Sequence, residues 1–131
     1  MNIEINVSAA EPVYEQIVRQ IHVLVERGGL APGTPLPPVR QLAADLELNP
    51  NTVARAYRLL EQQGVIKTAG RKGTFVRLDA ADEVTRQKTG RAERRVRHLV
   101  ETLVADGLSR QEIAELFSST LALRSKRKLQ P

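Results

Sequence analysis

The spacing of hydrophobic residues predicts three helices in the first half of the chain. Apolar side chains recur at intervals of three and four over residues 14–25, which is typical of an amphipathic helix, and Gly28-Gly29 ends it. A short helix is expected over about residues 38–46. A third begins at Asn49-Pro50 and runs to about Gln63, because asparagine is a favoured N-cap and proline suits the first helical position.

Strict alternation of apolar and polar residues predicts short β-strands. Residues 3–7 alternate in this way, as a half-buried strand would. Residues 65–68 and 74–77 flank a basic tip with glycines at 69–73, which predicts a β-hairpin. Residues 30–38 contain four prolines in nine positions, so we expect an ordered turn or extended loop there.

After a polar joint at 79–82, the pattern predicts two further helices separated by Gly107. Ser109 and Glu112 have the spacing of a capping box at the start of the second, and the basic run from Arg124 to Lys128 is expected to fray. Two helices alone cannot bury their apolar stripe, so a second copy is the economical partner and twofold pairing the common outcome. The predicted dimer contacts are Val96, Leu99, Val100, Leu103, Val104, Ile113, Leu116 and Phe117.

The order of these elements predicts a mainly α fold with a small β-hairpin wing. Helix, short helix, tight connection, helix and hairpin is the arrangement of a winged helix-turn-helix, here expected over residues 1–78. A two-helix dimerisation appendage with a basic tail would follow over residues 79–131. The third helix would turn its apolar residues inward, namely Val53, Ala56, Tyr57 and Leu60. We expect Tyr57 and Phe75 to belong to the core.

The opposite face of that third helix carries the candidate chemistry. It presents Asn51, Thr52, Arg55 and Arg58. Because an α-helix fits the DNA major groove and its N-terminal residues meet base edges, this face predicts DNA recognition. Arg71, Lys72 and Gly73 lie where a wing tip would reach the DNA backbone or minor groove.

The distribution of charge along the chain also points to residues 40–78 as the candidate DNA-binding surface. The chain has 20 basic and 15 acidic side chains, a net charge of +5, and residues 40–78 hold seven basic against three acidic ones. Such a surplus suits a polyanionic partner, the alternative being a merely solvated face. The basic stretch from Arg86 to Arg97 is more consistent with the solvated face of a helix than with a surface flanking DNA.

Composition excludes several other functions. Aromatic residues make up 3% of the chain, which argues against a single-strand binder that stacks bases. With no cysteine there is no disulfide, cysteine-based zinc site or cysteine nucleophile, and no other metal, cofactor or catalytic set is apparent, so an enzyme is not expected. Neither a signal peptide nor an apolar run of membrane-spanning length is seen, so we expect a cytoplasmic protein without membrane contact.

Five motifs occur in order over about residues 10–78. They are Pro12-Val-Tyr-Glu-Gln-Ile, Leu30-Ala-Pro-Gly-Thr-Pro-Leu-Pro-Pro-Val-Arg-Gln-Leu-Ala, Asn49-Pro-Asn-Thr-Val-Ala-Arg-Ala-Tyr, Leu60-Glu-Gln-Gln-Gly and Gly70-Arg-Lys-Gly-Thr-Phe-Val. Together they resemble the DNA-binding domain of GntR-family bacterial transcription regulators. The resemblance implies a homodimer that binds an inverted-repeat DNA operator and represses transcription. It also implies DNA contacts at Arg40, Asn49, Asn51, Thr52, Arg55 and Gly73.

The remaining sequence is similar to the YtrA-type branch of that family. The motif that starts at Asn49 has this character, and the 53 residues after Leu78 suit a small dimerisation appendage rather than a large sensory domain. A small-molecule effector could enter the dimer seam, but no convergent polar group marks a pocket. Two alternatives stay open. One is a winged-helix protein-interaction module, which would show an exposed apolar patch in place of the basic face. The other is a non-specific architectural DNA binder.

Overall fold

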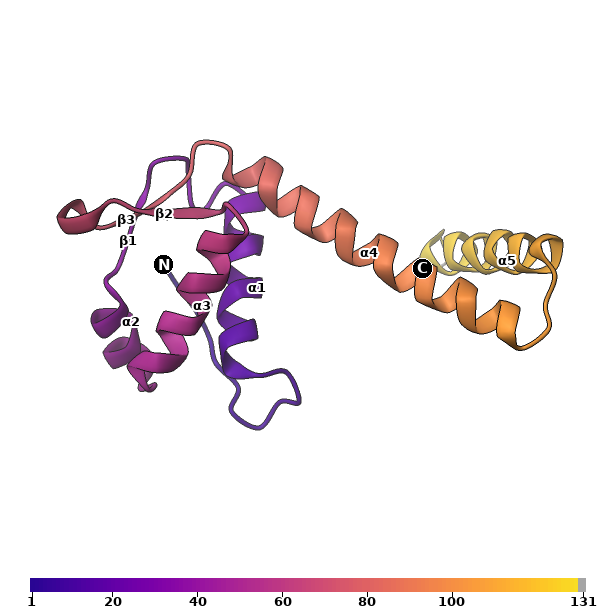
Figure 1. Cartoon of the computed structure of the whole chain (residues 1–131), viewed down its shortest axis with the longest axis horizontal. Helices are drawn as coiled ribbons and strands as arrows, with labels where there is room; N and C mark the ends of the chain where they lie inside the picture. Colours follow the sequence, from indigo (N-terminus) through magenta and orange to yellow (C-terminus); the bar gives the residue numbers. More distant parts are fainter. Residues whose placement is uncertain (130–131) are drawn as a thin grey trace. The chain divides into compact units, whose positions relative to one another are not determined.

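The computed structural model describes residues 1–129, which form five α-helices, one 3₁₀-helix and a three-stranded sheet (Figure 1). In chain order the elements are α1 (Val13–Glu26), β1 (Pro35–Leu36), α2 (Val39–Leu46), α3 (Pro50–Gln62), β2 (Ile66–Thr68), η1 (Gly70–Lys72), β3 (Thr74–Val76), α4 (Ala80–Ala105) and α5 (Arg110–Leu129). The predicted helices and hairpin are confirmed, as is the fold class. Contacts divide the chain into unit 1, Met1–Lys88, and unit 2, from residue 89 onward.

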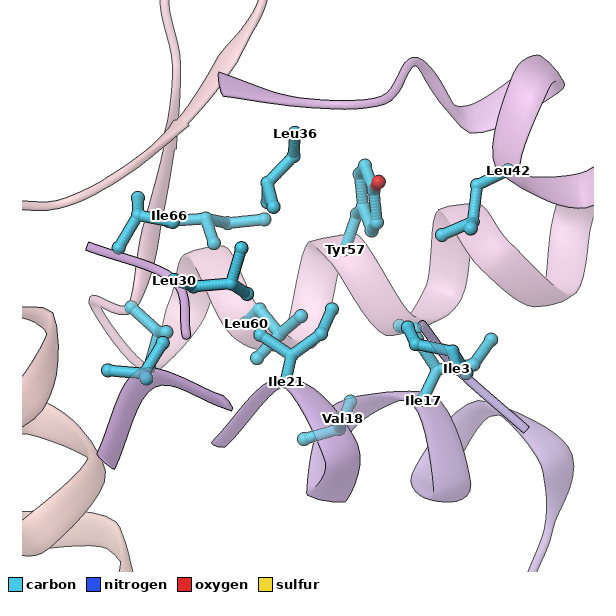
Figure 2. Close-up of a cluster of buried hydrophobic side chains, with 14 of the residues drawn as sticks. Ile3, Ile17, Val18, Ile21, Leu30, Leu36, Leu42, Tyr57, Leu60 and Ile66 are labelled. Atoms are coloured by element: carbon cyan, nitrogen blue, oxygen red, sulfur yellow. The ribbon is translucent and has the colours of Figure 1, made fainter. Parts of the chain in front are cut away.

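The core of unit 1 is built around α3, which packs against α1, α2 and β2. Val53 and Leu60 of α3 and Ile17 and Ile21 of α1 have no exposed surface. Figure 2 shows Ile21 and Leu60 meeting between these two helices, with Leu36 and Leu42 on the other side of α3. Each such aliphatic side chain contributes about 1.5–3 kcal/mol on burial, so this cluster holds α3 in one rotation about its axis.

The turn between α2 and α3 is tight and well capped. Glu47 ends α2 in the left-handed conformation, with φ 57° and ψ 44°. The Leu48 amide then donates to the carbonyl of Ala43 at 2.8 Å, and Ala43 itself is 1% exposed. The Asn49 side chain accepts a hydrogen bond from the Asn51 amide at 2.9 Å, which confirms the predicted N-cap.

The proline-rich stretch supplies a strand that the sequence did not predict. The sheet has the order β1-β3-β2, all antiparallel, with Pro35 opposite Phe75 and Ile66 opposite Val76. β1 is an edge strand of two residues, a position where proline is tolerated because only one side of the strand pairs. Leu36 turns inward and is buried, so β1 closes one side of the core.

The predicted strand over residues 3–7 is wrong, because glutamine side chains of α1 take the place of a strand partner. Gln16 accepts from the amide of Asn6 and donates to its carbonyl, both at 2.9 Å. Gln20 does the same for Glu4, at 2.9 and 2.6 Å. A primary amide offers the same donor and acceptor as a peptide group, so the segment is satisfied without a second strand. The alternation still marks burial at its start, since Ile3 is 6% exposed.

The first turns of α4 belong to unit 1. Ala80 and Val84 are each 1% exposed and join the same core. The contacts of unit 1 therefore continue to Lys88, past the boundary at residue 78 that the sequence suggested.

Within unit 2, the chain turns at Gly107 and α5 starts with the predicted capping box. The Glu112 amide donates to the Ser109 hydroxyl and the Ser109 amide donates to the Glu112 carboxylate, each at 3.1 Å. The bond from the Ser109 amide to the carboxylate is the main cause that lowers the pKa of Glu112. The expected fraying of Arg124 to Lys128 is wrong, because α5 continues to Leu129. Lysine and arginine are good helix formers and suit the negative end of the helix dipole.

Replacing Gln16 tests the role of these glutamines. Gln16 is 3% exposed and makes a further bond to the carbonyl of Glu11 at 2.8 Å. Gln16→Leu leaves the Asn6 amide and the Glu11 carbonyl without their Gln16 partner, while the Asn6 carbonyl keeps its bond from the Ala9 amide. We therefore expect the free energy of unfolding in urea to fall by about 1–3 kcal/mol. Both tyrosines lie in unit 1, so tyrosine fluorescence reports this transition. Gln20→Leu is the matched control, since water replaces its exposed bonds; an equal loss there would contradict the explanation.

Candidate nucleic-acid interface

The outward face of α3 is polar and basic, as predicted. Asn51, Arg55 and Arg58 are exposed and Thr52 is half-buried, because the residues between them are held in the core. The first turn of α3 contains no acidic residue. Asn49 is exposed too, but its side-chain oxygen already caps the helix, which leaves its amide nitrogen for an external partner. The start of α3 therefore presents hydrogen-bond donors and positive charge together.

The basic side chains of this surface are not neutralised by carboxylates. Four ion pairs occur among the described residues: Arg19–Glu11, Arg77–Asp79, Arg86–Glu83 and Lys88–Glu26. Within residues 1–129, none of these ion pairs involves a basic residue that was predicted to contact DNA. Those residues are Arg40, Arg55, Arg58, Arg71 and Lys72. Because these charges are uncompensated and exposed, their combined field attracts a polyanion.

Arg40 lies exposed in the first turn of α2, at a place that α3 helps to define. The Tyr57 hydroxyl donates to the carbonyl of Pro37 at 2.7 Å, which ties α3 to the loop just before α2. Pro38 occupies the N-cap of α2 and provides no side-chain bond. The Tyr57 bond thus contributes to fixing the start of α2 where a capping side chain is missing.

The wing ends in a single 3₁₀ turn, η1, which the sequence did not predict. Arg71 and Lys72 are exposed in this turn. Gly73 follows with φ 103°, a backbone conformation that residues with a side chain rarely adopt. Its carbonyl accepts a hydrogen bond from the Ala69 amide at 2.8 Å. The glycine therefore closes the tip and keeps both cations at its end. In Figure 1 the wing tip and the start of α3 lie on the left side of unit 1.

One aromatic residue differs from the sequence-based expectation, and another makes a contact that the sequence did not predict. Phe75 was expected in the core and is only half-buried, because its neighbour Val76 takes the inward position of the strand. The period of two along β3 was the signal that could have shown this. Tyr14 makes a contact that the sequence did not predict: the Arg55 guanidinium lies over its ring, with Cζ 3.9 Å from the ring centroid. No sequence signal links these two residues, which are far apart in the chain.

The fold of unit 1, a helix-turn-helix followed by a β-hairpin wing, is that of the winged helix-turn-helix proteins. In this chain both the outward face of α3 and the wing tip are basic. The family model for "Bacterial regulatory proteins, gntR family" matches residues 13–76. The transcriptional repressor YtrA of Bacillus subtilis is 36% identical over 98 residues, which span 75% of each chain. The protein thus belongs to the GntR family of bacterial regulatory proteins.

Solved structures extend the similarity over most of the chain. A transcriptional regulator from Oenococcus oeni is 32% identical with a TM-score of 0.67, covering 89% of this chain and 97% of its own. YtrA from Sulfolobus acidocaldarius, a GntR-family transcription factor, is 30% identical with a TM-score of 0.57, covering 92% and 97%. The similarity is therefore not confined to the winged helix. In residues 1–129 no helix combines the length and hydropathy needed to cross a membrane.

The buried hydroxyl of Tyr57 predicts a dependence of stability on alkaline pH. Burial raises its pKa from 10.0 to about 12. The folded-state pKa lies above the unfolded one, so the stability from this group is complete below pH 10 and is lost as the pH rises toward 12. Tyr57→Phe loses the bond to Pro37, and we expect it to be about 1 kcal/mol less stable at pH 8.

The difference between the wild type and Tyr57→Phe should shrink above pH 10 and change sign before pH 12, because the stability lost through a pKa rise from 10.0 to about 12 is larger than the roughly 1 kcal/mol that the bond contributes. Urea unfolding at pH 8, 10 and 11 measures it, and the comparison cancels other groups that titrate in this range. A difference that stays constant up to pH 11 would show that the hydroxyl does not titrate in this way.

Proposed function

We propose that this protein is a transcriptional repressor that binds an inverted-repeat DNA operator as a homodimer. In this proposal residues 1–78 bind DNA and residues 79–131 hold the dimer together. The observation that supports it most is the exposed face of α3, whose arginines have no carboxylate partner among residues 1–129. Repression follows the activity printed in the name of the B. subtilis relative.

The proposed roles follow from chemistry and position. Arg55 would read a guanine with two hydrogen bonds, since its guanidinium donates in a fork that matches the major-groove edge of that base. Asn51 and Thr52, one turn earlier, would meet neighbouring base edges or phosphates. Arg40 at the start of α2 and Arg58 further along α3 would contact phosphates, which fix the register but carry no sequence information. Asn49, Arg71, Lys72 and Gly73 would complete the contacts.

The two alternatives differ from this proposal in their partner or in selectivity. A protein-interaction module would need an apolar docking face, whereas the outward side of α3 is basic and polar. An architectural DNA binder would use the same phosphate contacts without preferring any sequence. Selection of bound duplexes from a random library, followed by competition with scrambled DNA, separates these functions. Equal competition by scrambled DNA would refute the operator.

Two substitutions should separate base reading from phosphate contact. Arg55→Ala should weaken binding to the selected duplex by about 5–150-fold, the equivalent of about 1–3 kcal/mol, and weaken scrambled DNA much less. Lys72→Ala should weaken both duplexes similarly and lower the slope of log affinity against log salt by about one. Gel-shift titrations at several salt concentrations measure both effects. A loss from Lys72→Ala restricted to the selected duplex would contradict its assignment.

The proposed dimer rests on the apolar surface of unit 2. Ile113 is the one buried residue there among those whose burial the structure describes, residues 89–126. Several large apolar side chains are 45–57% exposed, namely Val96, Leu99, Val104 and Leu116, and Val100, Leu103 and Phe117 are half-buried. Covering such surface with a second copy removes it from water, which stabilises the dimer by about 25 cal/mol for each Å² of apolar surface buried. Seven of the eight residues predicted from the sequence supply the accessible surface of the proposed interface, whereas Ile113 is already buried within unit 2 and has little surface left for a partner.

A pair of lysine substitutions tests this interface. Leu99→Lys places a charge on the apolar stripe, so we expect the dimer dissociation constant to rise about tenfold or more. Glu101→Lys introduces the same side chain at an exposed position off the stripe and should leave it within about twofold. Sedimentation equilibrium at micromolar concentration measures both. A wild-type monomer, or an equal effect of the two variants, would argue against the proposed dimer.

A further inference from the structure

The first turn of α1 contributes the aromatic ring of Tyr14 to the outward surface of α3. Tyr14 is half-buried at the edge of the core, and the guanidinium of Arg55 lies over its ring at 3.9 Å. The Tyr14 hydroxyl donates to the carboxylate of Glu15 at 3.1 Å. The ring face, and not the hydroxyl, is therefore what meets Arg55.

This contact lies within the candidate DNA-binding surface. An open hollow of about 410 Å³ is lined by Val13, Tyr14, Asn51, Thr52, Arg55 and Arg58. A neighbouring hollow of about 280 Å³ shares Tyr14 and both arginines. Tyr14 is thus the aromatic side chain around which the polar residues of α3 are arranged.

The contact holds Arg55 without using its donors. A cation over an aromatic face is attracted by the ring quadrupole, which requires no N–H group. Among residues 1–129, no hydrogen bond or ion pair occupies the Arg55 guanidinium. Its N–H groups remain available while the freedom of a long side chain is already reduced.

We propose that Tyr14 is a positioning residue for sequence recognition, and that its ring preorganises Arg55 for contact with a base edge. This inference rests on the proposed function. An arginine that is already held loses less conformational freedom when it binds, and this gain applies where its geometry matters, at the specific site. Phosphate contacts, which tolerate many orientations of the cation, gain little. Tyr14 therefore raises the preference for the specific sequence more than it raises DNA affinity in general.

A double-mutant cycle with Arg55 tests the proposal. The probes are the duplex that the wild-type protein selects from a random library and a scrambled duplex of equal length and composition. Tyr14→Leu should reduce the ratio of the two affinities by about 2–5-fold, the range of an exposed cation–π contact. Tyr14→Phe keeps the ring and should stay close to the wild type. In an Arg55→Ala background, Tyr14→Leu should have no further effect on the ratio.

Two controls separate positioning from packing. Leu24→Ala removes another half-buried side chain of α1 that packs on the core and should leave the affinity ratio unchanged. In the free protein, NMR should show ring-current shifts of the Arg55 side-chain protons in the wild type and Tyr14→Phe, and their loss in Tyr14→Leu. This readout requires no DNA.

The outcomes that overturn the proposal are distinct from failure of the proposed function. If Tyr14→Leu acts equally in the Arg55→Ala background, or if it raises the affinity ratio, Tyr14 does not position Arg55. Loss of selectivity in Tyr14→Phe would instead assign the effect to the hydroxyl. If the wild type itself does not prefer the selected duplex, the proposed function fails and this inference fails with it.

Discussion

The burial of one stripe of α3 is the constraint on which the rest of unit 1 depends. Val53, Ala56, Tyr57 and Leu60 are 0–7% exposed, and they are spaced so that one face of the helix is fully used. In a helix with 3.6 residues per turn, fixing that face also fixes the direction of the residues between. The outward position of Asn51, Arg55 and Arg58 is thus a consequence of core packing.

Polar contacts between the helices and loops of unit 1 further restrict the arrangement that apolar packing produces. Tyr57 belongs to the buried stripe, yet its hydroxyl reaches Pro37 and sets the loop before α2. His22 of α1 lies 2.7 Å from the Gln63 side chain, just past the end of α3, so α1 and α3 are also joined by a polar contact beyond their apolar interface. Part-buried hydrogen bonds of this kind stabilise modestly on balance and are costly to break, which favours a single arrangement of the three helices.

The parts predicted correctly from the sequence depend on signals between neighbouring residues. Asn49-Pro50 marks the start of α3, the Ser109–Glu112 pair marks that of α5, and spacing separates the two faces of α3. The parts that were missed depend on partners distant in the chain. β1 exists because Leu36 and β3 meet across about 40 intervening residues, a pairing that no local pattern encodes.

Dependence on partners distant in the chain also explains why the conformation of the N-terminal segment and the contact of Tyr14 were not predicted. The alternation of residues 3–7 was real, but only the tertiary structure shows that Gln16 and Gln20 replace a strand partner. For the candidate site, the residue types and their outward direction could be predicted. The stacking of Arg55 on Tyr14 could not, because it depends on how α1 packs against α3.

The proposed dimer and the proposed sequence recognition require one another. One winged helix offers few side chains to base edges, each worth about 1–3 kcal/mol of discrimination. A genome presents about 10⁶–10⁹ competing sites, so a single copy of such a surface selects poorly. Joining two copies makes the second half-site contact intramolecular, and the selectivity of the two surfaces then combines. The exposed apolar stripe of unit 2, which has little use in a monomer, is the feature that would make α3 selective enough to regulate a gene.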